Sequence, residues 1–146
     1  MDHAIIKRLE TVMIGSILRL AIGLISALAV LLALRIWAAP GMTGAALGLS
    51  VEGAVGLATL RADIAGFFAG VGLLALAGVV RNDRRLLVAP MLLVGLALLG
   101  RVITLALDGL APPLVPPMVV ETVVLVLLAG GYRTLGDGSR PFRHPA

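Results

Sequence analysis

The chain has 146 residues, of which 60% are hydrophobic and 14% charged, with a formal net charge of +4. A water-soluble domain of this length cannot bury so many apolar side chains in one core, so this composition excludes an ordinary soluble fold. The absence of cysteine excludes disulfides and thiolate chemistry, and the basic residues lie between apolar runs rather than on one polar face, which argues against a nucleic-acid partner.

Four apolar runs are long enough to cross a membrane, because a helix rises about 1.5 Å per residue and about 20 residues span the hydrocarbon core. The predicted spans cover residues 11–37, 60–80, 86–107 and 116–132. The first run exceeds the apolar region of a cleavable signal peptide and contains Arg19, so it is a true span. The sequence therefore predicts an all-α fold, an integral membrane four-helix bundle over residues 11–133. An interfacial N-terminus at 1–10 precedes it, and a mobile cytoplasmic tail at 134–146 follows.

The basic residues alternate between the two sides of the predicted membrane. Lys and Arg precede the first span, recur in the "RNDRR" loop at residues 81–85 and follow the last span, whereas the other two connections have none. By the positive-inside rule, both termini and this loop are cytoplasmic. We therefore expect a multi-pass protein of the bacterial inner membrane.

The two outward connections differ in character. The first, over residues 38–59, is long, apolar and rich in glycine, and suits a short surface helix, a lid or simple packing. The second contains the "PPLVPP" segment, in which Pro116 and Pro117 suit the first turn of the last span. Gly109 suits the cap at the end of the third span.

Five charged residues gather near the outward side on this topology. The predicted charged cluster consists of Arg61, Asp63, Arg101, Asp108 and Glu121. Arg101 precedes Asp108 by seven residues, which places it roughly 10 Å below the outer boundary. Charges at such depth usually face the bundle interior and form pairs. By sign and depth, we expect Arg101 to pair with Glu121 and Arg61 to pair with Asp108, whereas Arg19, in the inner half of the first span, suits a side chain that snorkels to the cytoplasmic surface.

Three interpretations of the charged cluster are compatible with the sequence. The ion pairs can simply fix the register of the helices, since breaking a buried pair is costly even when the intact pair contributes little. They can line a polar pocket for the head group of a ligand, open to the outer face. They can also belong to a transport pathway, although a pathway needs polar groups in the inner half of the membrane as well.

A stripe of small residues marks the start of the second span. Ala62, Gly66 and Gly70 recur every four residues, a spacing that lets two helix backbones approach closely, and Gly100 is a further helix-packing candidate on the third span. We expect this stripe to pack against a neighbouring span of the same chain. An interface with a second copy is the alternative.

The sequence offers little for catalysis. His3 and His144 lie in the terminal segments, so they cannot complete a metal site or a catalytic triad with the carboxylates of the spans. No phosphate-binding loop with its strand and helix context occurs. We therefore expect no enzymatic activity, no metal and no cofactor.

The segments "LRADIAGFFAGVGLL" and "LLGRVITLALDGLAPP", followed by a glutamate in the last span, resemble a bacterial family of small four-helix integral membrane proteins that is classed as a domain of unknown function. The family pattern is R-A-acid-x-G-G, then G-R…D-G, then an acid. It falls on Arg61, Ala62, Asp63 and Gly66, then Gly100, Arg101, Asp108 and Gly109, then Glu121. The sequence departs from it at Ala65, where the first glycine of a pair would stand. The resemblance covers roughly residues 10–133 and implies a fold but no activity.

Taken together, these features predict a small non-catalytic membrane protein. We expect it to bind a lipid or an apolar ligand, or to act as an accessory subunit of a larger membrane complex, and a homo-oligomer is a further option. The alternative is a small transporter or channel that uses the same charged cluster. Continuity separates the two classes, because a transporter needs a polar path that reaches the cytoplasm.

Overall fold

The computed structural model describes residues 3–138, which form an all-helical chain with no β-strand among them. The elements are α1 (His3–Ala38), α2 (Pro40–Ala46), α3 (Gly53–Thr59), the π-helix η1 (Leu60–Ile64), α4 (Ala65–Arg81), the 3-10 helix η2 (Arg84–Leu87), α5 (Val88–Asp108), the 3-10 helix η3 (Pro112–Leu114) and α6 (Val115–Thr134). Four helical stretches are long and apolar enough to cross a membrane: Val12–Ala38, Gly53–Arg81, Arg84–Asp108 and Pro112–Thr134. The predicted all-helical fold with four candidate spans is confirmed.

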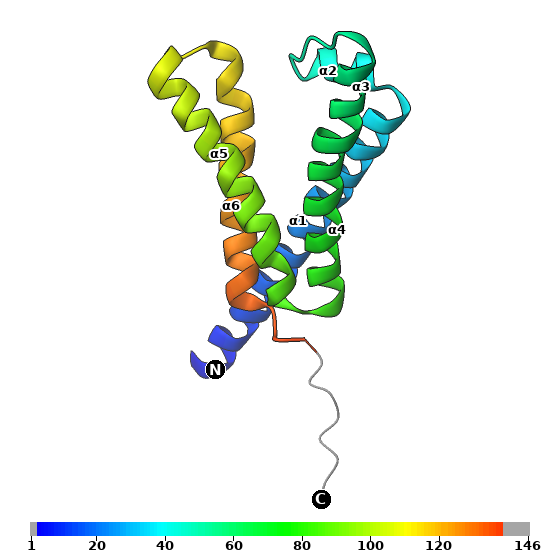
Figure 1. The fold of residues 1–146 in the computed structure, drawn as a ribbon. Helices are drawn as coiled ribbons and strands as arrows, with labels where there is room; N and C mark the ends of the chain where they lie inside the picture. The colour runs from blue at the N-terminus through cyan, green and yellow to red at the C-terminus, as the bar shows by residue number, and fades with distance from the viewer. Residues whose placement is uncertain (1–2, 139–146) are drawn as a thin grey trace, which may run out of the picture.

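The helices form two hairpins that diverge from a common end (Figure 1). One hairpin pairs α1 with α4, and the other pairs α5 with α6. They meet where residues 82–87 connect α4 to α5, which we call the closed end. They separate toward the end that carries α2, α3 and the turn at 109–114, which we call the open end.

The first hairpin is tightly packed because α4 presents small residues to α1. The buried residues of α4 include Ala65, Ala69, Gly72 and Ala75, whereas the buried Gly78 lies against Leu87 and Asp83. A Cβ atom on Gly72 would lie 2.7 Å from the backbone oxygen of Ser26 on α1, so the two backbones touch there. Small side chains permit such an approach between membrane helices.

The second hairpin is buried only near the closed end. Val94 on α5 and Leu128 and Gly131 on α6 are buried, and Leu128 belongs to a core with Ile22 of α1 and Leu87 of η2. No residue between 95 and 127, a stretch that the structure describes completely, is fully buried within the chain. The outer halves of α5 and α6 therefore contact each other but leave their other faces uncovered.

The second candidate span begins earlier than the sequence predicts. α3, η1 and α4 run without a break from Gly53, whereas the predicted span starts at residue 60. The connection between α1 and α3 is correspondingly short, and α2 folds back on the hairpin, with Gly44 against the side chains of Leu60 and Val51. Residues 38–59 contain the short helices α2 and α3 and are mostly exposed, so of the three options the short surface helix describes the segment best, with packing limited to Pro40 and Gly44.

The ends of the helices follow the sequence in most places. Gly109 adopts φ 83 and caps α5, and α6 begins with proline in its first turn, both as predicted. The predicted mobile tail is wrong at its start, because Leu135 is buried and residues 136–138 bond to the loop after α4. The remainder of that predicted tail, from 139 onward, lies outside the described residues, as do residues 1 and 2.

Candidate functional site

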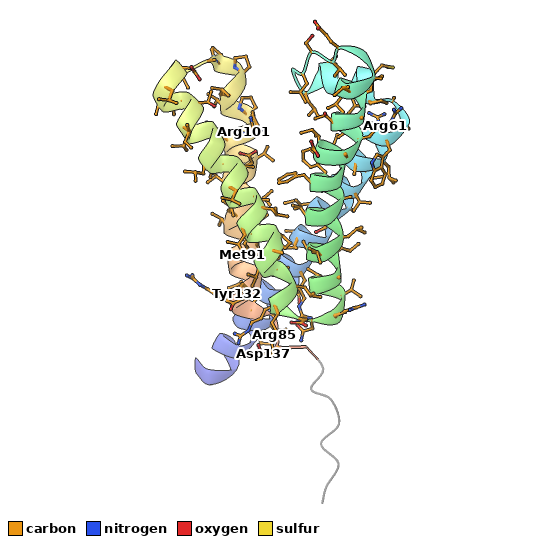
Figure 2. All side chains as sticks on the ribbon, in the orientation of Figure 1. Arg61, Arg85, Met91, Arg101, Tyr132 and Asp137 are labelled. Atoms are coloured by element: carbon orange, nitrogen blue, oxygen red, sulfur yellow. The ribbon has the colours of Figure 1, made fainter. Side chains whose placement is uncertain are left out.

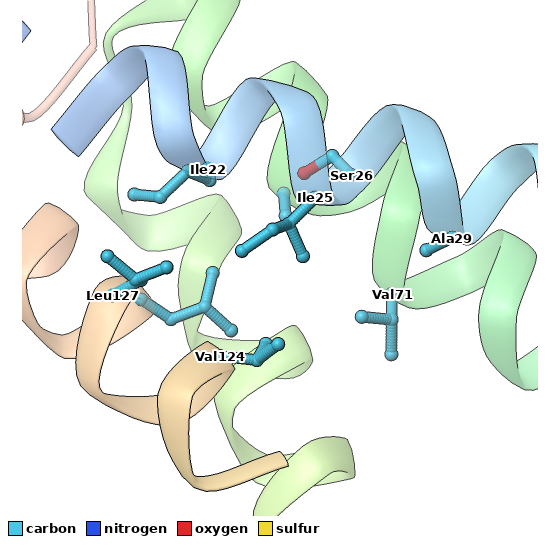
Figure 3. A pocket seen from close by; sticks show the side chains of 9 residues that line it. Ile22, Ile25, Ser26, Ala29, Val71, Val124 and Leu127 are labelled. Atoms are coloured by element: carbon cyan, nitrogen blue, oxygen red, sulfur yellow. The ribbon is translucent and has the colours of Figure 1, made fainter. Parts of the chain in front are cut away.

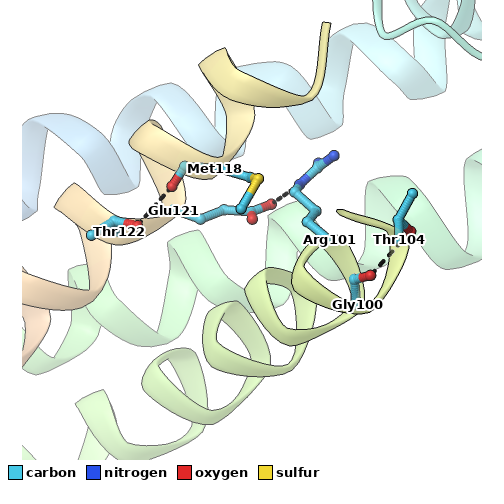
Figure 4. A network of polar contacts seen from close by, with 6 residues as sticks. All are labelled: Gly100, Arg101, Thr104, Met118, Glu121 and Thr122. Carbon is cyan, nitrogen blue, oxygen red and sulfur yellow. Dashed lines mark hydrogen bonds and ion pairs between the residues drawn. The ribbon is translucent and has the colours of Figure 1, made fainter. Parts of the chain in front are cut away.

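The predicted pair of Arg101 and Glu121 is present. Nε of Arg101 on α5 donates to Oε1 of Glu121 on α6 at 2.8 Å (Figure 4). The short proline turn between the two helices brings these positions to the same level of the hairpin, although 20 residues separate them in the chain. The sequence located this contact because a deep arginine needs a partner of opposite sign on a neighbouring helix.

The ion pair is only half made. Nε and Oε1 form one hydrogen bond, and in the part of the chain that the structure describes neither Nη group of Arg101 donates another. Glu121 Oε2 is buried and has no hydrogen-bond partner among those residues. An arginine and a carboxylate can form two parallel bonds, so this geometry leaves the Nη donors of Arg101 without a partner among residues 3–138 and encloses Oε2 of Glu121 within the chain without one.

The space on the closed-end side of the pair is small and apolar. A cavity of about 20 Å³ lies between α1, α4 and α6 where the hairpins diverge (Figure 3). It is lined by Ile22, Ile25, Ser26, Ala29, Val71, Ala75, Val124, Leu127 and Leu128. Val124 follows Glu121 by about one helical turn, so apolar walls continue directly from the ion pair toward the closed end. A cavity of this size has room for no more than about one water molecule, and its lining favours no water at all.

The predicted pair of Arg61 and Asp108 is wrong. The two residues belong to different hairpins, and Figure 2 shows Arg61 on the opposite arm from Arg101. Arg61 instead faces the end of α1: its Nε donates to the backbone oxygen of Trp37 at 3.5 Å, and Trp37 Nε1 donates to the backbone oxygen of Arg61 at 2.9 Å. A cation is favourable there because the carbonyl groups at the end of a helix carry partial negative charge.

The two aspartates of the predicted charged cluster are exposed, and neither forms a salt bridge among the described residues. Asp63 lies in η1, ten residues after the start of the continuous helix at Gly53, so it does not mark a helix N-terminus. Asp108 occupies the last position of α5. The structure therefore reduces the predicted charged cluster to one ion pair.

The π-helix η1 is a feature that the sequence does not predict. It contains Arg61, Ala62 and Asp63, all of which the sequence singles out. A π-helix turns more slowly per residue than an α-helix, and such segments are frequent at functional positions. Here it brings Arg61 to the end of α1. No local residue pattern distinguishes this insertion from an ordinary helical turn.

The predicted stripe of small residues does not mediate packing within the chain. A Cβ atom built on Gly66, Gly70 or Gly100 would meet no atom within 4 Å, and Ala62 is exposed. The close approach occurs at Gly72, on the neighbouring face of α4. Internal packing is thus wrong for these positions, and the alternative of an interface with a second copy stays a prediction.

Arg19 has a specific partner at the closed end. It donates to Oδ1 of Asn82, the residue that ends α4 with a left-handed backbone of φ 51. The same oxygen accepts from the backbone N–H of Gly136, and the backbone oxygen of Asn82 accepts from Gly138. The snorkelling interpretation is therefore incomplete, because Arg19 ties α1 to the loop after α4 and to the segment after α6.

A second set of contacts completes this closed-end clasp, which we define as Arg19, Asn82, Asp83, Arg84 and residues 136–138. Arg84 forms an ion pair with Asp137 and its guanidinium lies 5.5 Å from the ring centre of Tyr132. Asp83 caps η2 by accepting from the backbone N–H of Arg85, and bridges to Asp137 through the backbone. The basic residues of the "RNDRR" loop are part of the topology prediction, and the same loop also joins the two hairpins.

No group of three His, Asp or Glu side chains within residues 3–138 is placed to hold a metal ion. Comparisons with family models, with curated proteins and with solved structures find no match for this chain. The resemblance to a family of small membrane proteins stays a prediction, and the function rests on the geometry of the open end.

Proposed function

We propose that this chain is a non-catalytic membrane protein that holds a lipid or another apolar molecule between its two hairpins at the open end. The observation that carries the proposal is the half-made pair of Arg101 and Glu121, in a region where no residue of α5 or α6 is fully buried by the rest of the chain. Unsatisfied polar groups at membrane depth are costly, so an external molecule that accepts hydrogen bonds from the half-exposed Arg101 is stabilising.

The distribution of basic residues supports an orientation for this site. Arg81, Arg84, Arg85 and Arg133 lie near the closed end. By the positive-inside rule, the closed end would face the cytoplasm of a bacterium and the open end would face outward. A ligand would then enter from the outer leaflet of the inner membrane.

The alternative, a small transporter or channel, has less support. The closed end is filled by an apolar core that includes Ile22, Leu87 and Leu128, and the cavity above it is apolar. A transported polar substrate would need a hydrated path through this region. The arrangement therefore favours binding over passage.

Ligand retention tests this proposal. The protein is extracted from native membranes into lipid nanodiscs, and bound molecules are counted by native mass spectrometry. The wild type should retain a specific lipid or apolar molecule, and the double variant Arg101→Leu/Glu121→Leu should fold but lose it. Retention by both proteins would assign the pair a purely structural role, and co-isolation of a larger membrane protein would favour the accessory-subunit alternative.

A further inference from the structure

We infer that the protein binds an anionic phospholipid at the closed end, with the lipid phosphate against Arg85 and an acyl chain in a groove between α5 and α6. This second site is separate from the pair of Arg101 and Glu121 and does not depend on the function proposed for the open end. Three features carry the inference: an open apolar groove, an arginine beside its end, and walls made of large side chains.

The groove runs along the seam between α5 and α6. It has a volume of about 370 Å³ and is lined by Val88, Met91, Leu92, Leu125 and Tyr132. Binding sites for small molecules commonly measure about 300–1,000 Å³, so the groove has room for part of an acyl chain. Val88, Leu92 and Tyr132 are exposed on the surface of the chain. A molecule in the membrane can therefore reach these walls directly.

The groove begins near the closed end and extends toward the middle of the hairpin. Tyr132 follows Leu125 by seven residues, so the two lie roughly 10 Å apart along α6. Figure 2 shows Tyr132 near the closed end and Met91 farther along the same arm. Tyrosine is typical of the level at which lipid head groups meet the hydrocarbon. An acyl chain in the groove would run inward from a head group beside Tyr132.

Arg85 lies beside the closed end of the groove. Because η2 continues into α5, Arg85 shares a helix face with Val88, three residues later, and with Leu92, seven residues later. Helical side chains lean toward the N-terminus of their helix, which places the guanidinium on the side of the head groups. Arg85 is exposed, and its side chain forms no hydrogen bond or ion pair with the side chains that the structure describes. A lipid phosphate can bind there without displacing another anion.

The charges around Arg85 favour an anionic head group. Residues 81–85 and 132–137 contain four arginines and two aspartates. Asp137 pairs with Arg84, whose guanidinium lies 5.5 Å from the ring centre of Tyr132. Asp83 accepts from the backbone N–H of Arg85, not from its guanidinium. The region therefore keeps an excess of positive charge, and basic pockets between membrane helices bind anionic lipid head groups in this way.

The walls of the groove suit an acyl chain better than a second helix. Membrane helices approach closely where small residues line the contact, whereas this groove is lined by large side chains. The two glycines of α6 face α1, with Gly130 against Leu18 and Gly131 against Ile22. The groove is also shorter than about two helical turns. A flexible hydrocarbon chain can follow such a short and uneven surface.

Competition between head groups tests the charge of the ligand. The full-length protein is placed in nanodiscs with equal amounts of palmitoyl-oleoyl phosphatidylglycerol and phosphatidylcholine, and native mass spectrometry counts the lipids that stay bound. Both lipids have the same chains and one phosphate, but choline adds a compensating cation. We expect the wild type to retain phosphatidylglycerol about fivefold better, because one arginine near an anionic lipid contributes about 1 kcal/mol.

Two arginines of the same loop separate a defined site from diffuse attraction. Arg85→Gln should lower the preference for phosphatidylglycerol to about onefold. The variant should fold, because Arg85 bonds to the described part of the chain through its backbone N–H. Arg81→Gln makes the same change of charge at the end of α4, on the other hairpin, and should keep the wild-type preference.

Two leucines of α5 test the groove itself. Leu92→Trp fills the groove with an indole ring, whereas Leu99→Trp places the same ring roughly 10 Å farther along the helix. The two leucines are 63% and 52% exposed, so neither change should disturb the fold. Leu92→Trp should lower the amount of bound phosphatidylglycerol at least about fourfold, the effect of losing contact with one CH₂ group. Leu99→Trp should leave it unchanged.

Four results would overturn the inference. They are equal retention of both lipids by the wild type, equal losses of preference in Arg85→Gln and Arg81→Gln, full binding by Leu92→Trp, and a preference that disappears in the double leucine variant of the open-end pair. The last result would place the anionic lipid at the open end. A dimer or a co-isolated protein that dissociates in Leu92→Trp would assign the groove to a protein partner and would overturn the inference as well. Should Arg85→Gln fail to fold, the wild-type competition and the two tryptophan variants decide.

Discussion

Arg101 shows how far one residue can be understood from sequence. Its depth, its sign and the absence of a local partner predict an anion on the next helix, and Glu121 fills that role. The sequence could not predict that the pair makes one hydrogen bond instead of two. That depends on the rotation of α5 and α6 about their axes, which only the packing of the hairpin fixes.

Removing one member of the pair should be more harmful than removing both. Arg101→Leu leaves the carboxylate of Glu121, whose Oε2 is buried, without a cation, and we expect a loss of about 3 kcal/mol in the free energy of unfolding. Adding Glu121→Leu should restore about 1 to 2 kcal/mol. Unfolding in mixed micelles, followed by circular dichroism, measures all variants. Additive losses would contradict a direct interaction between the two side chains.

Asn82 offers a second test at the scale of one residue. Asn82→Ala removes the acceptor for Arg19 and Gly136 and places an alanine at φ 51, so we expect a loss of about 2 kcal/mol in unfolding free energy. Asn82→Gly removes the same side chain but relieves the backbone strain, so it reports the contribution of the side chain alone. Its loss in unfolding free energy should be about 1 kcal/mol smaller than that of Asn82→Ala. Equal stabilities of the asparagine and glycine proteins would show that the side chain contributes nothing to the closed-end clasp.

At the scale of the element, α4 shows why a small-residue motif can be assigned to the wrong face. Gly66 and Gly70 have the predicted spacing, but the face that meets α1 carries Ala65, Ala69 and Gly72. Both stripes lie on one helix. Each residue is rotated by about 100° from the one before it, so a stripe shifted by one position lies on another face of the helix. Spacing alone cannot choose between them, because the choice depends on which side the other helix occupies.

Two glycines of α4 provide a matched pair of substitutions. Gly72→Ala places a Cβ 2.7 Å from the Ser26 backbone oxygen and 2.8 Å from the Val30 side chain, so we expect α1 and α4 to be pushed apart. Gly70→Ala adds a methyl group in open space and gains helix propensity. The free energy of unfolding of Gly72→Ala should be lower than that of Gly70→Ala by about 2 kcal/mol. The same stability for both variants would contradict the observed helix contact.

At the scale of the whole molecule, the two hairpins are joined at one end only. The closed-end clasp and the core around Ile22, Leu87 and Leu128 hold them together, while the outer halves of α5 and α6 contain no fully buried residue. The chain has no native cysteine, so spin labels can be attached at chosen positions without background. This makes the divergence of the hairpins measurable in a membrane.

Distances between spin-label pairs should differ at the two ends. Labels at exposed residues Val55 and Leu107 report on the open end, and labels at Val80 and Leu92 report on the closed end. Pulsed electron paramagnetic resonance in nanodiscs should give the longer mean distance and the broader distribution at the open end, because less packing restrains it. Equal distances at both ends would indicate a closed parallel bundle instead.

The orientation of the molecule is a separate prediction. With the closed end in the cytoplasm, a cysteine at Met42 in α2 should react with a membrane-impermeant maleimide in intact spheroplasts. A cysteine at Thr134, at the end of α6, should react only after lysis. The opposite pattern would place the open end in the cytoplasm and contradict the positive-inside assignment.

The sequence by itself determined the all-helical class, the four candidate spans, the cap at Gly109 and the pair of Arg101 with Glu121. Each of these depends on hydropathy, local backbone preference or the sign and depth of a charge, which are properties of short segments. Only the tertiary structure decided that Arg61 faces Trp37, that Gly72 rather than Gly70 touches α1, and that Asn82 joins α1 to the end of α6. These contacts depend on the rotation of each helix and on the divergence of the two hairpins, and both are set by packing among residues far apart in the chain.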